Sequence, residues 1–283
     1  MLLGDFLKEG ISRLKSLYPP EEARDIVLTL CESRLGTGRY TYATDPDYSI
    51  APDSLDSLSG DMDRLSAGEP LQYVLGYAWF LGRRFKVTTD VLIPRPETEI
   101  LCQEAIKAFK DPRGRILDLC TGSGCVAWSL ALELPGSVVY GVDISKAALA
   151  VASGQDLSSD RSSPVFLKAD ILDSPPLFPC GKFDLILSNP PYIMESQKKD
   201  MRPNVLDHEP SLALFVPDED PLVFYRAVAR WAEALLAEDG TGLVEINETL
   251  GSQTRDLFLG FGFGKVEIID DFFGKNRFVK FMR

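Results

Sequence analysis

The spacing of apolar residues divides the chain into regions of different character. Residues 1–75 repeat apolar positions at helical intervals, as in DFLKEGISRLKSLY, where Phe6, Ile11, Leu14 and Leu17 are expected near one face. The segments EEARDIVLTLCESRL and APDSLDSLSGDMDRLSAG continue this pattern. The sequence therefore predicts a helical bundle over residues 1–75, and nothing in that bundle offers chemistry by itself.

The pattern then changes to aromatic and β-branched residues. The run YVLGYAWFLGRRFKVTTDVLIP is broken by Gly76 and Gly82. This composition is typical of strands separated by a turn. Residues 76–93 are therefore predicted to form a β-hairpin that bridges two domains.

From residue 94 to residue 283, short apolar runs alternate with helical stretches. Strands that alternate with helices indicate a parallel sheet covered on both faces. The last two apolar runs, KVEIIDDF and RFVKFM, are joined by a turn too short for a helical crossover, so they form an antiparallel pair. The predicted fold is α/β, a seven-stranded Rossmann-like sheet with a small helical N-terminal domain. The other five strands are expected at 115–120, 138–143, 165–170, 183–189 and 242–247.

Composition narrows the function classes. The 283 residues carry a net charge of −12, which disfavours a protein that grips the phosphates of duplex nucleic acid. Apolar runs are shorter than a membrane span, and Asp5 comes too early for a signal peptide. Five scattered cysteines and a single histidine, His208, make a metal site unexpected. We interpret the chain as a cytoplasmic protein with reduced thiols.

The segment DLCTGSGC follows the first predicted parallel strand and opens a helical stretch. Gly122 and Gly124 allow a tight turn and a close approach of the backbone to a ligand. Asp143 ends the next strand about 20 residues further on, where a carboxylate accepts hydrogen bonds from ribose hydroxyls. The pattern indicates an adenosyl nucleoside and leaves NAD, S-adenosylmethionine and an ordinary strand–helix turn open.

Two further carboxylates favour the sulfonium cofactor. Asp118 precedes the glycines, where it would repel a pyrophosphate but tolerate a positively charged methionyl group. Asp170 ends the third strand, where it can bond an adenine amino group while Ile171 covers the ring. A helix N-cap is the alternative role for Asp170.

The segment LSNPPYI follows the fourth strand, which Pro190 and Pro191 end and stiffen. The Asn189 side chain and the Pro190 backbone each carry a carbonyl that can accept a proton from a planar nitrogen. Two such acceptors would hold a carboxamide or an aromatic amine in line with a methyl group. Tyr192 would offer a flat surface to the substrate. An Asx-type turn that closes the strand is the alternative.

With these motifs the chain resembles the class I S-adenosylmethionine-dependent methyltransferases, and within them the protein-(glutamine-N5) methyltransferases of peptide chain release factors. The likeness covers nearly the whole chain. Asn-Pro-Pro-Tyr alone is shared with DNA adenine methyltransferases, whereas PRPETE and EPLQY together are much narrower. The matching segments are GEPLQYVLGYAWFLGRRFKV, VLIPRPETE, ILDLCTGSGC, LSNPPYI, HEPSLAL and DFFGKNRFV.

The resemblance implies S-adenosylmethionine as cofactor and S-adenosylhomocysteine as product. It implies catalysis by Asn189, Pro190 and Tyr192, which with Pro191 would hold the glutamine of a release factor's Gly-Gly-Gln loop. It also implies a helical domain, 1–75, that contacts the release factor, and a methyltransferase domain over 94–283. We expect the chain to be a monomer. Beside Asp118 and Asp170, the implied cofactor contacts are Cys120, Thr121, Gly122, Ser123, Gly124, Asp143, Ile171 and Asn189.

The chain departs from the family pattern at several places. The segment EINETLGSQ lacks the glycine usual after Glu-x, and Gln253 is out of step with the family's glutamine. Position 120 is Cys where the family usually has Gly, which is expected to narrow the loop unless its φ is negative. Ile171 stands where family members often carry an aromatic residue.

Three other functions remain open. A glutamine methyltransferase for a ribosomal protein would share the chemistry and differ in the N-terminal domain. A DNA adenine-N6 methyltransferase would need a basic recognition domain, which is not evident. A cofactor-binding module with a vestigial site would not need the intact Asn189, Pro190 and Tyr192.

Overall fold

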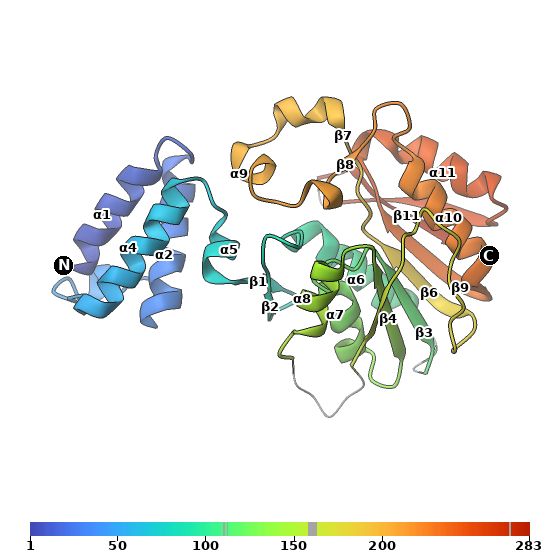
Figure 1. The fold of residues 1–283 in the computed structure, drawn as a ribbon, viewed down its shortest axis with the longest axis horizontal. Coiled ribbons are helices and arrows are strands. Elements are labelled where there is room, and N and C mark those ends of the chain that lie inside the picture. The colour runs from blue at the N-terminus through green and yellow to red at the C-terminus, as the bar shows by residue number, and fades with distance from the viewer. Residues whose placement is uncertain (110, 112, 158–162, 272) are drawn as a thin grey trace. The chain divides into compact units, whose positions relative to one another are not determined.

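The computed structural model describes residues 1–109, 111, 113–157, 163–271 and 273–283. It divides into two compact units (Figure 1). The first unit consists of residues 1–77 and 202–208, and the second of residues 78–201 and 209–283.

The first unit is built from helices around its own apolar core. Leu14, Val27 and Leu58 are fully buried in that core. Leu17 does not join them, because the first helix ends at Leu14 and leaves Leu17 40% exposed. The helices are α1 (Leu3–Leu14), α2 (Pro20–Leu35), α3 (Thr41–Thr44), α4 (Pro52–Ser66), α5 (Leu71–Leu75) and α9 (Pro203–Leu206).

Helix α9 joins the first unit from a distant part of the sequence. Arg202, just before α9, forms a 2.6 Å ion pair with Glu22. Asn204 within α9 makes a side-chain hydrogen bond to Tyr18, which is buried. The chain therefore enters the first unit twice, once from its beginning and once between residues 201 and 209.

Strands β1 (Tyr77–Phe80) and β2 (Arg83–Lys86) form a two-stranded sheet where residues 1–77 give way to the second unit. Leu81 and Gly82 form the turn, with φ of +46° and +72°. Two consecutive positive φ values are typical of the tight turns whose twist matches that of the flanking strands. A hairpin is thus present within the predicted range 76–93, but its strands cover only residues 77–86.

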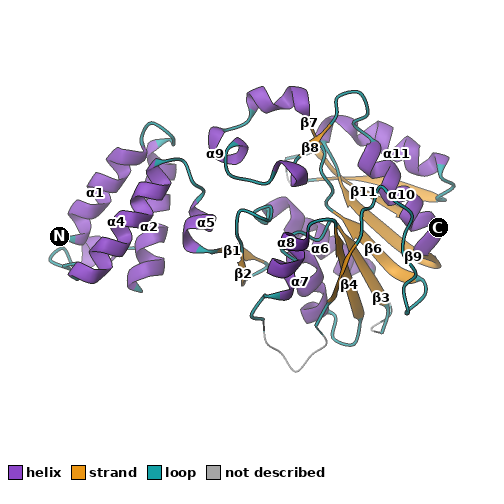
Figure 2. Ribbon diagram, in the orientation of Figure 1, coloured by secondary structure: helices purple, strands orange, loops and turns teal. Residues whose placement is uncertain are grey.

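The second unit contains the predicted seven-stranded sheet, in the order β10-β11-β9-β6-β3-β4-β5 (Figure 2). The neighbouring strands β9, β6, β3, β4 and β5 run parallel to one another, and β11 pairs antiparallel with both β9 and β10. The segment DFFGKNRFV includes residue 272, which lies outside the described residues. The strands are β3 (Arg115–Leu119), β4 (Val138–Asp143), β5 (Val165–Lys168), β6 (Phe183–Ser188), β9 (Leu236–Glu245), β10 (Lys265–Asp270) and β11 (Asn276–Met282).

Helices cover both faces of this sheet, because successive strand residues point to opposite sides. Ile116, Leu185 and Leu243 pack into one core with α6 (Pro96–Ala108) and α7 (Cys125–Glu133). The residue after each of them in sequence enters the other core, which contains α10 (Val223–Leu235) and α11 (Gly251–Gly260). Helix α8 (Lys146–Ser153) packs beside β4 and β5, and the short strands β7 (Ile193–Met194) and β8 (Phe215–Val216) pair separately.

Candidate active site

The order of the strands brings the two predicted motifs together. From β3 the chain runs outward to β4 and β5 and then returns to β6, on the other side of β3. Leu119 and Ser188 are partners across β3 and β6, and the Ser188 hydroxyl donates to the Leu119 carbonyl at 3.0 Å. Ligands of such sheets bind at the strand ends where the order reverses. The segments 118–124 and 189–192 therefore leave neighbouring strands at this point.

The loop after β3 is held by its own side chains. Asp118 is 2% exposed, and its Oδ2 accepts a hydrogen bond from Thr121 Oγ1 at 2.5 Å. The Gly124 amide donates to the Thr121 carbonyl at 2.8 Å. Gly122 and Gly124 have φ of +53° and +78°, which explains glycine at both positions. Gly124 is also the residue from which α7 begins.

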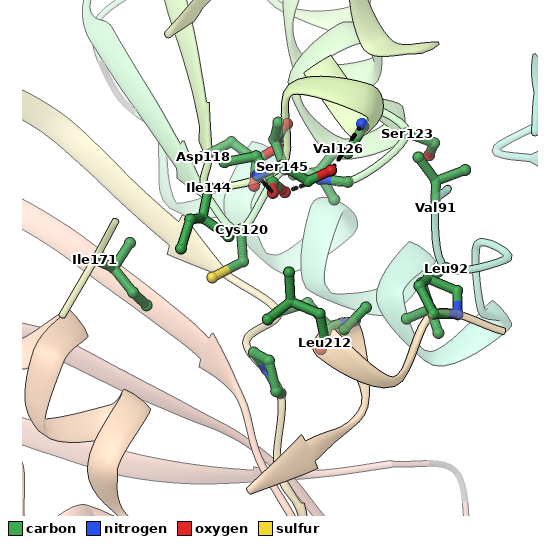
Figure 3. Close-up of a pocket in the computed structure, with 18 of the residues that line it drawn as sticks. Val91, Leu92, Asp118, Cys120, Ser123, Val126, Ile144, Ser145, Ile171 and Leu212 are labelled. Atoms are coloured by element: carbon green, nitrogen blue, oxygen red, sulfur yellow. Dashed lines mark hydrogen bonds between the residues drawn. The ribbon is translucent and has the colours of Figure 1, made fainter. Parts of the chain in front are cut away.

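Cys120 shares this left-handed conformation without being glycine. Its φ is +59°, so the negative φ under which Cys120 was not expected to narrow the loop is not found, and the residue is in a strained conformation. In Figure 3 its sulfur points into the space between Ile171 and Leu212. Burial raises the pKa of the Cys120 thiol well above its usual range, so the group remains a neutral thiol.

Asp143 connects this loop to the next strand–helix turn. One carboxylate oxygen accepts from the Gly122 amide at 2.9 Å, and the other accepts from the Ser145 amide at 2.9 Å. Burial raises the pKa of Asp143, although these amides favour its ionised form. The carboxylate that the sequence assigns to a ribose thus also fixes the shape of the loop.

The turn after β5 lines the same cavity as the loops after β3 and β4. Asp170 Oδ1 accepts from the Leu172 amide at 2.8 Å, which closes an Asx turn, and no described helix begins there. Ile171 is 4% exposed, whereas Ile144, which follows Asp143, is 40% exposed. Both isoleucines line the cavity, and only Ile171 was predicted from the sequence.

These loops enclose a cavity of about 360 Å³ (Figure 3). Among the predicted site residues, Gly124, Pro190 and Tyr192 do not line it. A Cβ on Gly124 would approach Ala152 at 3.0 Å and Phe166 at 3.1 Å, so this glycine serves close packing behind the loop. The predicted residues that line the cavity are Asp118, Cys120, Thr121, Gly122, Ser123, Asp143, Asp170, Ile171, Asn189 and Pro191.

Asn189 reaches the cavity as part of a hydrogen-bonded chain of side chains. Its Nδ2 donates to Thr98 Oγ1 at 3.0 Å, and Thr98 Oγ1 donates to Glu245 Oε2 at 2.8 Å. The Tyr192 hydroxyl donates to the other oxygen, Glu245 Oε1, at 3.0 Å. Thr98 comes from α6 and Glu245 from the end of β9. Three separate elements therefore meet around one carboxylate.

Burial dominates the electrostatics of this chain of side chains. Glu245 is 1% exposed, and burial raises its pKa to about 7 although hydrogen bonds from Thr98 and Tyr192 act in the opposite direction. Burial and the neighbouring Glu245 raise the pKa of Tyr192 well above its usual range. Burial likewise raises the pKa of Asp118 to about 7. Perturbed carboxylates in a cleft are typical of functional sites.

Thr98, Glu245 and the pair Arg95–Glu209 were not predicted from the sequence. Arg95 lines the cavity, and its guanidinium lies 2.6 Å from Glu209 Oε1. Glu209, 5% exposed, also accepts from the Ile93 amide at 3.3 Å. A glutamate inside the apolar run GLVEIN was a usable signal, since a buried carboxylate needs partners. The partners themselves come from distant segments.

Two classes of feature are not found in the described part of the chain. No group of three or more His, Cys, Asp or Glu side chains there is arranged to hold a metal ion. None of the helices described combines the length and the apolar character that crossing a bilayer requires.

Comparison with known proteins places the chain in a family. Residues 5–76 match the family model described as the PrmC N-terminal domain, and residues 97–208 match the methyltransferase small domain. The chain is 40% identical over 264 residues to the release factor glutamine methyltransferase of Bacteroides thetaiotaomicron, covering 93% of this chain and 94% of that protein. The chain belongs to the release factor glutamine methyltransferase family.

Other relatives agree with this membership. The release factor glutamine methyltransferase of Flavobacterium psychrophilum is 34% identical over 284 residues, and the match covers 99% of both chains. A methyltransferase crystal structure from Pyrococcus furiosus superposes with a TM-score of 0.51 at 15% identity, covering 79% of this chain and 98% of that one. The latter likeness shows the fold alone. The family resemblance seen in the motifs is confirmed.

Proposed function

We propose that the protein transfers a methyl group from S-adenosylmethionine to the side-chain amide nitrogen of the Gly-Gly-Gln glutamine in peptide chain release factors. One observation carries this proposal. Asn189, anchored through Nδ2 to Thr98, borders the cavity that Asp118 and Asp143 also line. The names of the relatives at 40% and 34% identity support the same reaction.

The donor set fits this cofactor. Asp143 stands at the end of β4, where ribose hydroxyls would be bound, and Asp118 supplies a carboxylate near the positive methionyl group. Asp170 would take the adenine amino group, and Ile144 and Ile171 would offer apolar surfaces to the ring. A volume of about 360 Å³ lies in the range of small-molecule sites. When bound, the cofactor supplies an electrophilic methyl group on a sulfonium.

The substrate side needs orientation more than a strong base. The lone pair of a carboxamide nitrogen is delocalised, so this nitrogen is a weak nucleophile. Asn189 Oδ1, which borders the cavity, would accept one of its N–H protons and direct the nitrogen toward the methyl group. The Pro190 carbonyl is the acceptor expected for the second proton, and it would have to turn toward the cavity, which Pro190 does not line. The nitrogen gains one methyl and releases one proton to water after transfer. Such positioning can contribute roughly 7–11 kcal/mol. Tyr192 does not line the cavity, so it would act on the substrate through the segment 189–192, which its bond to Glu245 helps to hold.

The proposal extends to the two units. The helical unit, residues 1–77 with 202–208, would recognise the body of the release factor, while the second unit carries the transfer site. The net charge of −12 supports a protein substrate over duplex nucleic acid. We propose that the chain acts as a monomer.

The direct test is methyl transfer with purified components. The protein is incubated with isotopically labelled S-adenosylmethionine and a release factor, and the modified peptide is identified by mass spectrometry. We expect one methyl group on the Gly-Gly-Gln glutamine and none when that glutamine is changed to alanine. Label that persists on the altered release factor, or that appears only on a ribosomal protein or a DNA oligonucleotide, would overturn the proposal.

A variant pair tests the residue at the centre. We expect Asn189→Ala to lower turnover by more than about a hundredfold while cofactor binding by calorimetry changes far less. Asn276→Ala is the matched control, because the Asn276 amide bonds Asp270 at the terminal hairpin and does not line the cavity. Near-normal turnover in Asn189→Ala would remove the role assigned to Asn189.

A further inference from the structure

Glu245 holds both polar side chains of the Asn-Pro-Pro-Tyr segment, although it does not line the cavity. One of its oxygens accepts a hydrogen bond from the Thr98 hydroxyl, whose own oxygen accepts from Asn189 Nδ2. The other oxygen accepts from the Tyr192 hydroxyl. Tyr192 is also fixed at its backbone, where its carbonyl accepts from Asn247 Nδ2 at 3.0 Å. The two ends of the segment therefore depend on one buried carboxylate.

Counting protons along this chain of side chains determines which way the Asn189 amide faces. An ionised carboxylate has no proton to donate, so the Thr98 hydroxyl must donate to Glu245. A hydroxyl has one proton, and Thr98 can then offer only lone pairs to its other neighbour. Asn189 must consequently present its NH₂ group to Thr98, as the 3.0 Å contact shows. Its carbonyl oxygen is left on the opposite side of the amide group.

We propose that Glu245 is a positioning residue for methyl transfer, which acts through Thr98 to hold the Asn189 carbonyl ready for the substrate amide. This inference rests on the proposed function and deepens it, since Asn189 Oδ1 is the acceptor assigned there. Without the Glu245 carboxylate, the Thr98 proton is free to bond Asn189 Oδ1, and the amide can turn over. The acceptor would then be replaced by an NH₂ group that repels the substrate's own N–H.

The first experiment compares two substitutions at position 98. Thr98→Val keeps the branched shape and removes the hydroxyl, whereas Thr98→Ser keeps the hydroxyl. We expect kcat on the release factor to fall about ten- to hundredfold in Thr98→Val and to stay within about threefold in Thr98→Ser. Thr254→Val is the matched control, because the buried Thr254 hydroxyl has no hydrogen-bond partner within the described residues. A packing role alone would let Thr98→Val keep its activity.

The second experiment asks whether the residues act in one chain. Glu245→Gln keeps the size of the side chain, but its single amide oxygen cannot accept from both hydroxyls. We expect a loss of about tenfold or more in kcat, and a double variant with Thr98→Val no worse than about threefold below Thr98→Val alone. In an Asn189→Ala background, Thr98→Val should have no further effect on the residual rate. Losses that multiply independently would overturn the inference.

A third measurement does not depend on turnover. In protein with ¹⁵N-labelled asparagine, the Asn189 side-chain amide is assigned by its loss in Asn189→Ala. We expect one Nδ2 proton to show the downfield shift and slow exchange of a hydrogen bond in the unsubstituted protein and in Thr98→Ser. Both signatures should be lost in Thr98→Val and altered in Glu245→Gln. Unchanged resonances would overturn the inference, even if release-factor methylation itself failed.

Discussion

Asp118 and Glu245 are two buried carboxylates that have similar surroundings but bond partners at very different distances along the sequence. They are 2% and 1% exposed, and burial raises the pKa of each to about 7. Each accepts a hydrogen bond from a threonine hydroxyl. The Asp118 partner, Thr121, is three residues away, whereas Thr98 and Tyr192 lie 147 and 53 residues from Glu245.

Because Asp118 bonds a local partner and Glu245 bonds distant ones, we expect the two carboxylates to have different roles at this edge of the sheet. Asp118 lies in β3 and bonds Thr121 in the loop that follows, so we expect its influence on the side of the cavity that the proposed function assigns to the cofactor. Glu245 links α6, β9 and the segment after β6 through hydrogen bonds, so we expect its influence on the side that the proposed function assigns to the substrate. Similar burial and similar pKa values therefore do not imply similar roles, and kinetics should separate the two carboxylates.

The largest expected effect is that alanine substitution of Glu245 and of Asp118 changes different kinetic parameters. Glu245→Ala leaves two buried hydroxyls without their acceptor, and we expect kcat to fall about a hundredfold while KM for the cofactor stays within about threefold. Asp118→Ala should instead raise the cofactor KM about tenfold or more. Steady-state rates at varied cofactor check both. Asp184→Asn, in a part-buried carboxylate bonded to Arg115, is the control and should change neither. The same split in both alanine variants would contradict the comparison.

The next effect concerns the pH dependence of kcat. Protonated Glu245 carries a proton of its own and cannot accept from both hydroxyls, so kcat should fall about tenfold per pH unit below an apparent pKa near 7. This limb should disappear in Glu245→Gln and persist in Asp118→Asn. A limb that persists in Glu245→Gln would show that another group controls it. The groups that interact with Glu245 through hydrogen bonds or charge are Thr98, Tyr192, Arg277, Glu97, Tyr225 and Cys102.

A smaller effect is expected on stability. Both carboxylates have a folded pKa raised from about 4 to about 7, so their contribution is fully present below pH 4 and is lost as pH rises to 7. Asp118→Asn and Glu245→Gln remove this loss. As the pH rises from 5 to 7, the unfolding free energy of each variant relative to the unsubstituted protein should therefore rise by about 2 kcal/mol, measured by urea denaturation. A difference that is constant with pH would show that the pKa of that carboxylate is not raised by folding.

The smallest effect tests the strain beside Asp118. Cys120 has φ +59°, and a non-glycine residue in this region costs roughly 1–2 kcal/mol, part of which glycine returns through the entropy of the unfolded chain. Cys120→Gly should therefore raise the unfolding free energy by about 0.5–1 kcal/mol. Cys120→Ala is the control, since it removes the thiol and keeps the strain. Equal changes in the two variants, measured by thermal unfolding, would exclude backbone strain as the cause.

Much of the fold could be predicted from the sequence because its signals are local. The runs predicted as strands at 115–120 and 138–143 are bounded by turns; the first exceeds β3 by one residue and the second coincides with β4. The last parallel strand was placed less well, since β9 begins at Leu236, directly after α10, rather than at Gly242. The segment AEDG looks like a loop in isolation, and only pairing with β6 recruits its flanks into the sheet.

The site divides along the same line. Asp118 lies near the end of an apolar run, and the glycines and Asn189 follow such runs, so their positions at strand ends can be inferred from the chain alone. Thr98 and Glu209 follow no such rule, because their roles arise only when α6 and the segment before Ser211 fold against other parts of the second unit. Long-range pairing of side chains is a property of the folded state, and a single sequence does not encode it in its spacing.

The return of residues 202–208 to the helical unit has a consequence for protein engineering. A cut between residues 77 and 78 would separate Arg202 from Glu22 and Asn204 from Tyr18. Exchanging the helical unit for that of another protein therefore requires two coordinated replacements, one at residues 1–77 and one at residues 202–208. Replacing residues 1–77 alone would leave residues 202–208 without the side chains that they contact in this protein.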